Sequence, residues 1–198
     1  MSIDYLIIIF AISFATNSTP FFGTPYTLVA TSFLVKSGIT PLNMIEVILI
    51  TAIGAALAKS VMYSLGYGIR NTFKNNKNVK FFSKFINKRS FFIALFFAAL
   101  FPFLPLDDFI FLIGGAGKAS LLKMLEITFV SKIIKSSIEI TVEAFGLIAI
   151  SDLIGISPFL LGIISSIVFT ILGIVLFKID WESIYTKLKD KFDLFYTD

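Results

Sequence analysis

The stretch Asn17-Ser18-Thr19-Pro20-Phe21-Phe22-Gly23-Thr24-Pro25 interrupts the first apolar tract of the chain. It lies in the middle of a long uncharged tract between Asp4 and Lys36. As one helix this tract would be about 46 Å long, more than a hydrocarbon core of about 30 Å requires. Two prolines and a glycine break a helix, so the stretch predicts two half-helices that turn back within the membrane as a re-entrant hairpin. The alternative is a kink between two ordinary halves of one helix.

The composition is that of a helical membrane protein. The 198 residues are 57% hydrophobic, include 24 Phe and have a mean hydropathy of +0.91, which is more apolar surface than a soluble domain of this size buries. The 15% of residues that are charged cluster between long uncharged tracts. With no Cys and no His, disulfides, imidazole bases and the common zinc and haem ligand sets are excluded. We expect no enzyme, no cofactor and no metal, and no nucleic-acid partner because the basic residues flank apolar tracts.

Apolar and ionic segments continue to alternate along the chain. Residues 41–69 are long enough to cross a bilayer, and residues 70–89 then carry seven basic residues and no acid, which predicts that this connector is cytoplasmic. The connector is also predicted to be an amphipathic surface helix whose lysines could hold anionic lipid head groups: Lys77, Lys80, Lys84 and Lys88. Residues 90–106 form a second broken tract, 121–150 and 153–177 predict two crossing helices, and 179–198 predict a cytoplasmic amphipathic tail.

The chain also aligns with itself. The shift that brings Pro25 onto Pro105 also brings Gly66 onto Gly146, without a gap. Two copies of one unit, about 5–69 and 90–150, therefore each contain a re-entrant hairpin and one crossing helix. Because each copy makes one net crossing of the membrane, the second copy begins on the opposite side and has the inverted orientation. The predicted fold is an all-α polytopic integral membrane protein, one domain over residues 1–178, with two inverted repeats and a final transmembrane helix. Such repeats place a substrate site at their interface near the midplane.

The residues at the two breaks are the first candidates for a substrate path. Each break frees backbone groups that hydrocarbon cannot satisfy, so both breaks should converge on a polar cavity. The break residues are Asn17, Pro20, Gly23, Pro25, Pro102 and Pro105.

Asp107 and Asp108 follow the second break, at the positive end of a half-helix. One of them is expected to be the N-cap, and the other either shares that structural role or binds a cation, a proton or a lipid amine. Lys59 has no partner four residues away in its own helix. Asp107 or Asp108 is therefore its candidate counter-ion across the repeat interface; the alternative is that Lys59 snorkels to the surface.

Lys132, Lys135, Glu139 and Glu143 place charge on one face of the helix predicted over residues 121–150. They fall within an arc of about 80° at about 100° per residue, so this face must meet protein or water. One reading is structural, since Lys135 and Glu139 are spaced to neutralise each other. The other reading is the wall of a hydrophilic groove in which the lysines attract phosphate.

Two groups of residues resemble the DedA/VTT (SNARE-associated Golgi protein) membrane family. Residues 17–30, Gly38, Gly54 and residues 63–70 are similar to its first half, and Phe101-Pro-Phe-Leu-Pro-Leu-Asp-Asp-Phe-Ile-Phe-Leu-Ile-Gly-Gly115 to its second. The resemblance covers residues 1 to about 178. It implies two facing re-entrant hairpins in a group that includes phospholipid scramblases and polyprenyl-phosphate translocases, with some bacterial members linked to proton-dependent membrane homeostasis.

The sequence also departs from that family pattern. Many members carry an acid near the first hairpin, where Asn17, Tyr26 and Thr27 stand here, and an arginine near the second, where only Phe and Ala precede Pro102. Many also have an acid where Lys59 stands. Proton coupling of the family type is therefore not predicted. The Pro-Leu-Asp-Asp form is similar to the more divergent VTT branch, which gives Asp107 and Asp108 the candidate role by position.

The first functional hypothesis is a lipid translocase or scramblase in the cell membrane, with the connector and C-terminus cytoplasmic. Lys59, Lys132 and Lys135 would contact a head-group phosphate, while Asp107 and Asp108 would meet an amine or cation. The partners are then membrane lipids, including anionic ones, and a homo-oligomer is left open. The competing hypotheses are a proton- or cation-coupled transporter of a small solute and a non-transporting membrane scaffold.

Overall fold

The protein is helical throughout the described part of the chain. The computed structural model describes residues 1–19, 25–73, 86, 88–101 and 106–178, and these residues form helices and connecting turns without strands. The all-α prediction is therefore confirmed. The helices are α1 (Ile3–Ser18), α2 (Tyr26–Ser37), α3 (Pro41–Phe73), α5 (Arg89–Leu100), α6 (Leu106–Ala116), α7 (Leu121–Ile154) and α8 (Pro158–Lys178).

Helices α1 and α2 form an antiparallel hairpin, as the first break predicts. The N-terminal amine donates hydrogen bonds to Glu46 at 2.8 Å and to the side-chain oxygen of Asn43 at 3.0 Å. Asn43 in turn donates to the carbonyl of Gly38 at 2.7 Å. The start of α1 and the end of α2 thus lie together at the start of α3, and the break lies at the other end. Pro20 and Gly23 fall outside the described residues, while Pro25 is the N-cap of α2.

Helices α5 and α6 form a second hairpin. The side chain of Ile86, just before α5, lies against Gly117, just after α6. Phe91 in the first turn of α5 is likewise close to Gly114 near the end of α6. The outer ends of the two helices therefore meet, and the break between them lies at the opposite end. Pro102 and Pro105 in this break fall outside the described residues.

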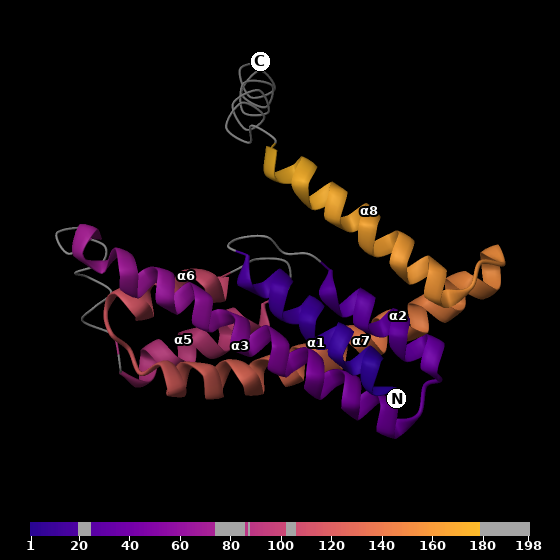
Figure 1. The fold of residues 1–198 in the computed structure, drawn as a ribbon, viewed down its shortest axis with the longest axis horizontal. Coiled ribbons are helices and arrows are strands. Elements are labelled where there is room, and N and C mark those ends of the chain that lie inside the picture. The colour runs from indigo at the N-terminus through magenta and orange to yellow at the C-terminus, as the bar shows by residue number, and fades with distance from the viewer. Residues whose placement is uncertain (20–24, 74–85, 87, 102–105, 179–198) are drawn as a thin grey trace, which may run out of the picture.

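Two long helices, α3 and α7, run antiparallel and join the hairpins (Figure 1). Helix α1 packs on α3 as α5 packs on α7, and α6 packs on α3 as α2 packs on α7. The apolar core is accordingly in two parts. One contains Met62 and Met124 and the other contains Val47 and Ile140, so each half of α3 is paired with the opposite half of α7.

The helices repeat at the same interval as the sequence. Helices α2 and α6 begin at Tyr26 and Leu106, one residue after the aligned prolines Pro25 and Pro105. The starts of α3 and α7 are separated by the same interval. Each break is followed by a proline and then by a short helix that leads into a long one. The residues that the sequence alignment pairs therefore begin equivalent helices, α2 with α6 and α3 with α7.

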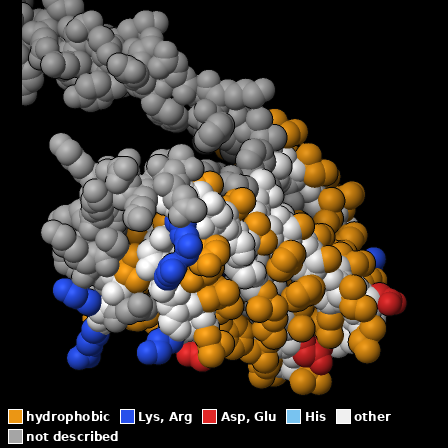
Figure 2. Space-filling model, turned by 60° about the vertical axis from the view of Figure 1, so that its left-hand side comes forward, with side chains coloured by type: hydrophobic (Ala, Val, Ile, Leu, Met, Phe, Trp, Pro, Cys, Tyr) orange, Lys and Arg blue, Asp and Glu red, His pale blue; other side chains and the backbone are white. Residues whose placement is uncertain are grey.

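One helix, Pro41–Arg70, is long and apolar enough to cross a membrane. The α7 and α8 pair passes the same test only together and is bent by 108°, so the described residues contain one or two such spans. Hydrophobic side chains cover a broad area of the surface in Figure 2, and most of the visible basic ones lie toward its left-hand side. Among the most exposed are Leu122, Phe145 and Leu153, each at least 67% exposed.

The last helix begins later than the predicted span over residues 153–177. Residues 153 and 154 still belong to α7, whose C-cap is Gly155 with a φ of +73°, and α8 begins at Pro158. The predicted start of this helix was wrong because hydropathy alone does not detect the turn between α7 and α8. A left-handed glycine followed by a proline is a helix stop and restart signal. The tail over residues 179–198 falls outside the described residues.

Candidate functional site

A buried network of four charged side chains joins α3, α6 and α7. The amino group of Lys59 lies 2.5 Å from an Asp108 oxygen and 3.3 Å from an Asp107 oxygen, and that of Lys132 lies 2.9 Å from the same Asp107 oxygen. All four side chains are at most 4% exposed. Two positive and two negative charges give a network that is neutral overall, which is the condition under which buried charges are tolerated.

The network lies where the tips of the two hairpins face each other. Asp107 and Asp108 are in the first turn of α6, directly after the second break. At the other tip, Tyr26 begins α2 and lies within electrostatic range of Lys59 and Asp107. Gly54, in the middle of α3, lies against Phe10 and Ser13 in the middle of α1. Lys59 is little more than one turn further along α3, so the network is between the two apolar cores.

The predicted counter-ion of Lys59 is confirmed by these contacts. Lys59 on α3 pairs with both aspartates of α6, which are far from it in sequence, and does not reach the surface. The expected N-cap role is wrong in detail, because α6 begins at Leu106 and both aspartates lie inside its first turn. Their carboxylates still meet the positive end of the helix, where unpaired backbone N–H groups favour an anion.

Lys135 and Glu139 form the predicted i,i+4 pair, with 3.8 Å between charged atoms. The amino group of Lys135 also donates to the carbonyl oxygen of Phe101 at 3.4 Å. Phe101 follows the last residue of α5. A cation at this carbonyl satisfies a backbone acceptor that the helix end leaves free, so Lys135 holds the edge of the second break.

Glu143 makes contacts that the sequence did not predict. Its two carboxylate oxygens accept hydrogen bonds from the hydroxyls of Thr27 and Thr31, each at 2.8 Å. Both threonines are on α2 and at most 5% exposed. Glu143 is therefore part of the α2–α7 interface, one turn away from the Lys135–Glu139 pair. The only sequence signal was the spacing of Thr27 and Thr31, which places both hydroxyls on one face of a helix.

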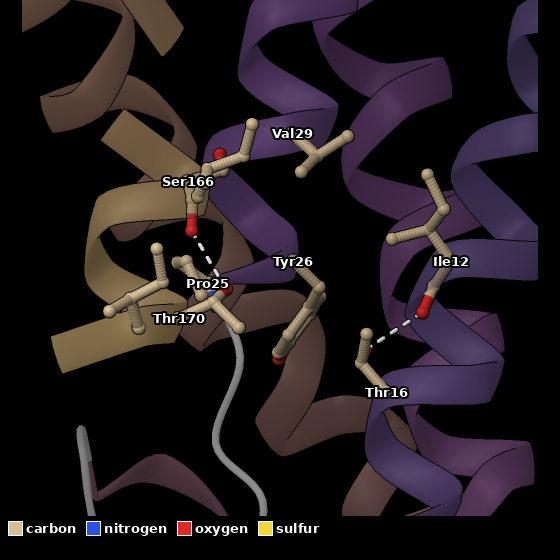
Figure 3. A pocket seen from close by; sticks show the side chains of 9 residues that line it. Ile12, Thr16, Pro25, Tyr26, Val29, Ser166 and Thr170 are labelled. Carbon is tan, nitrogen blue, oxygen red and sulfur yellow. Dashed lines mark hydrogen bonds between the residues drawn. The ribbon is translucent and has the colours of Figure 1, made fainter. Parts of the chain in front are cut away.

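A pocket of about 310 Å³ opens at the tip of the first hairpin, between α1, α2 and α8. Figure 3 shows Tyr26 between Pro25 and Thr16, with Ser166 and Thr170 on the same side as Pro25. The hydroxyls of Thr16, Ser166 and Thr170 donate to carbonyls of their own helices. The surface that lines the pocket is therefore mostly apolar.

Tyr26 stands between this pocket and the charged network. Its ring lines the pocket, and its buried hydroxyl lies near Asn17 and within electrostatic range of Lys59, Asp107 and Glu139. The hydroxyl makes no hydrogen bond of good geometry within the described part of the chain. Asn17 is also buried and donates to the carbonyl of Ser13 at 2.9 Å. Sequence reasoning selected Asn17 and missed Tyr26 as a wall of the pocket.

The structure thus brings together most of the described candidates from the two halves of the chain. Asn17 and Pro25 belong to the first tip, Asp107, Asp108, Lys59 and Lys132 to the network, and Lys135, Glu139 and Glu143 to the adjoining face of α7. Of the connector lysines, Lys88 is exposed at the start of α5. Lys77, Lys80 and Lys84 fall outside the described residues.

No model of a known protein family, no curated protein and no solved structure matches the chain. The described residues also hold no group of three or more acidic side chains that could bind a metal ion. The described site offers paired charges, hydroxyl groups and an apolar pocket. Such a set can bind a zwitterionic or phosphate-bearing molecule with an apolar part.

Proposed function

We propose that the protein is a multi-pass membrane protein of the DedA/VTT type that carries a phosphate-bearing lipid head group across the bilayer. The lipid tails would remain in the membrane while the head group passes between the two hairpin tips. The observation that carries the proposal is the buried Lys59–Asp107–Asp108–Lys132 network, which lies where two antiparallel hairpins meet. Ionisable groups at that depth in a membrane are costly and typically line a transport path.

The arrangement of the helices supports inverted repeats around that network. Helices α1 and α2 reach it from one end of α3, while α5 and α6 reach it from the other. Interrupted helices that meet in this way place a polar site near the middle of the bilayer. The broad exposed apolar surface would then face lipid (Figure 2).

A head group would reach the network from the pocket beside Tyr26. The pocket is lined by α8 on one side and by the first tip on the other, with an apolar wall suited to lipid tails. The two lysines of the network, Lys59 and Lys132, lie behind Tyr26. They would release their ion pairs with the aspartates and bind the lipid phosphate instead. In that exchange the aspartates become available for the amine of a zwitterionic head group, so the charge of the network stays balanced.

The test is lipid scrambling by the purified protein in liposomes. A fluorescent phospholipid is present in both leaflets, and a membrane-impermeant quencher is added outside. We expect quenching to proceed beyond the outer-leaflet half of the label. Protection at the level of empty liposomes, with the protein shown to be inserted and helical, would refute the proposal.

A matched pair of variants tests the route. Val29→Trp fills the pocket beside Tyr26, whereas Val142→Trp makes the same change on a side chain that is 66% exposed. We expect the first variant to slow scrambling severalfold and the second to leave it unchanged. Equal rates in both variants would place the route elsewhere.

The second candidate function is a cation-coupled transporter of a small solute, and Glu143 favours it. Its carboxylate is bound by two threonine hydroxyls, and no ion pair with a cationic side chain is found for it among the described residues. Carboxylate and hydroxyl oxygens are suitable ligands for a hard cation. Uptake driven by an imposed cation gradient, without lipid scrambling, would favour this function over the first.

A further inference from the structure

An aromatic cage at the base of the first hairpin holds a cation supplied by the chain itself. The amino group of Lys36 lies 4.4 Å from the ring centre of Phe159 and 5.3 Å from that of Tyr5. Phe33 packs between these two rings, with centroid distances of 5.0 Å to Tyr5 and 5.5 Å to Phe159. Distances below about 6 Å are those of cation–π attraction. We call Tyr5, Phe33 and Phe159 the aromatic cage.

The cage is built from three helices that meet at one end of the molecule. Tyr5 is on α1, Phe33 on α2 and Phe159 in the first turn of α8. This is the end at which the N-terminal amine meets Glu46, opposite to the end of α3 that leads into the basic connector. In a membrane this end lies at the head-group level, where aromatic side chains are typical.

Lys36 is an occupant that can leave the cage. It is exposed, on a flexible stem, and its amino group has no ion pair among the described contacts. Cation–π attraction at an exposed site is weak enough for another ammonium group to compete. Phe159 also brings the first turn of α8 next to the cage, and the positive end of a helix dipole favours an anion.

We propose that the aromatic cage binds the ammonium group of a zwitterionic phospholipid, in exchange for the amino group of Lys36. The adjoining phosphate lies at the first turn of α8. Because the present occupant is a primary ammonium, phosphatidylethanolamine is the lipid of closest chemistry, and the rings also accept the quaternary ammonium of phosphatidylcholine. The inference names the class of head group for the translocation proposed above. It rests on the part of that proposal that places the protein in a membrane, and it does not require that the protein transports lipid.

Lipid retention by the full chain in detergent, followed by native mass spectrometry, tests the inference. Phosphatidylethanolamine, phosphatidylcholine and phosphatidylglycerol with identical acyl chains are added together. We expect the two ammonium lipids to be retained about threefold or more over phosphatidylglycerol, as an exposed cation–π site would give. Lys36→Met, which removes the competing amine, should raise this preference. Equal retention of the three lipids by the wild type and by Lys36→Met overturns the inference.

Two further arms identify the group that is recognised. Phe159→Leu and Tyr5→Leu should each remove the preference, while Phe169→Leu, on the same helix and 55% exposed, should keep it. Soluble phosphoethanolamine should compete with the ammonium lipids. Retention that persists at saturating competitor would show recognition of acyl chains alone and would overturn the inference.

Binding and transport can fail separately. A head-group preference without scrambling would support ammonium binding by the aromatic cage and refute the proposed lipid translocase. Scrambling without any preference leaves the translocase and refutes the cage.

Discussion

Lys132 should be essential to stability because its removal leaves a buried carboxylate short of one partner. Lys132→Met takes away the 2.9 Å contact with Asp107 and gives the buried network a net negative charge. We expect a loss of about 3–5 kcal/mol in the free energy of unfolding, the usual cost of breaking a buried pair. Denaturant titration in detergent measures it.

The control for this residue is Lys123→Met, the same change on an exposed lysine of the same helix, with an expected effect within about 0.5 kcal/mol. Adding Asp107→Asn to Lys132→Met restores a neutral network and should recover part of the loss. A double variant as unstable as the sum of the single ones would contradict the charge-balance argument.

Glu143 offers a second prediction at the scale of single residues. The Thr31 hydroxyl lies 2.8 Å both from Glu143 and from the carbonyl of Thr27, although it carries only one proton. In Glu143→Gln the amide can donate to Thr31 and accept from Thr27, so stability should be retained. Glu143→Leu leaves the Thr27 hydroxyl without its acceptor and should cost about 1–3 kcal/mol. Thermal unfolding in detergent distinguishes the two variants; equal loss in both would contradict this account.

At the scale of elements, the crossing of α3 and α6 depends on the absence of a side chain at Gly66. A Cβ there would collide with the backbone of Leu112, whereas one at Gly146, the residue aligned with Gly66 in the sequence, would meet no atom within 4 Å. Gly66→Ala should therefore destabilise by about 1–3 kcal/mol, while Gly146→Ala should be neutral or gain up to about 1 kcal/mol. Thermal shift assays can compare the two, and a stable Gly66→Ala variant would contradict the packing.

At the scale of the whole molecule, the hairpins predict which surfaces share a side of the membrane. Ser2 and Thr40 are at the base of the first hairpin, while Lys88 and Lys118 are at the base of the second, and all four are exposed. Cysteines introduced singly at the first two positions should react with an impermeant thiol reagent from one side, and those at the last two from the other. The native chain has no Cys, so background labelling is absent. Labelling of positions 2 and 40 from opposite sides would mean that the first tract spans.

The breaks in the helices could be read from the sequence because their causes are local. Two prolines and a glycine in the stretch from Asn17 to Pro25 end α1 at Ser18 and allow α2 to begin at Tyr26. The ionic pairing of Lys59 was predictable as well, since a lysine without an in-helix partner needs a counter-ion in an apolar setting. The late start of α8 had local signals too, in Gly155 and Pro158.

The sequence by itself determined the helical class, the two breaks and the interval at which the helices repeat, because hydropathy and backbone constraints act within one or two helical turns. Only the tertiary structure decided which charges and rings meet. Glu143 on α7 finds Thr27 on α2, and Lys36 at the end of α2 reaches Phe159 at the start of α8, in both cases through helix packing. The physical reason is that a pairing of this kind depends on the crossing and register of separate helices, and no local preference of the chain encodes either.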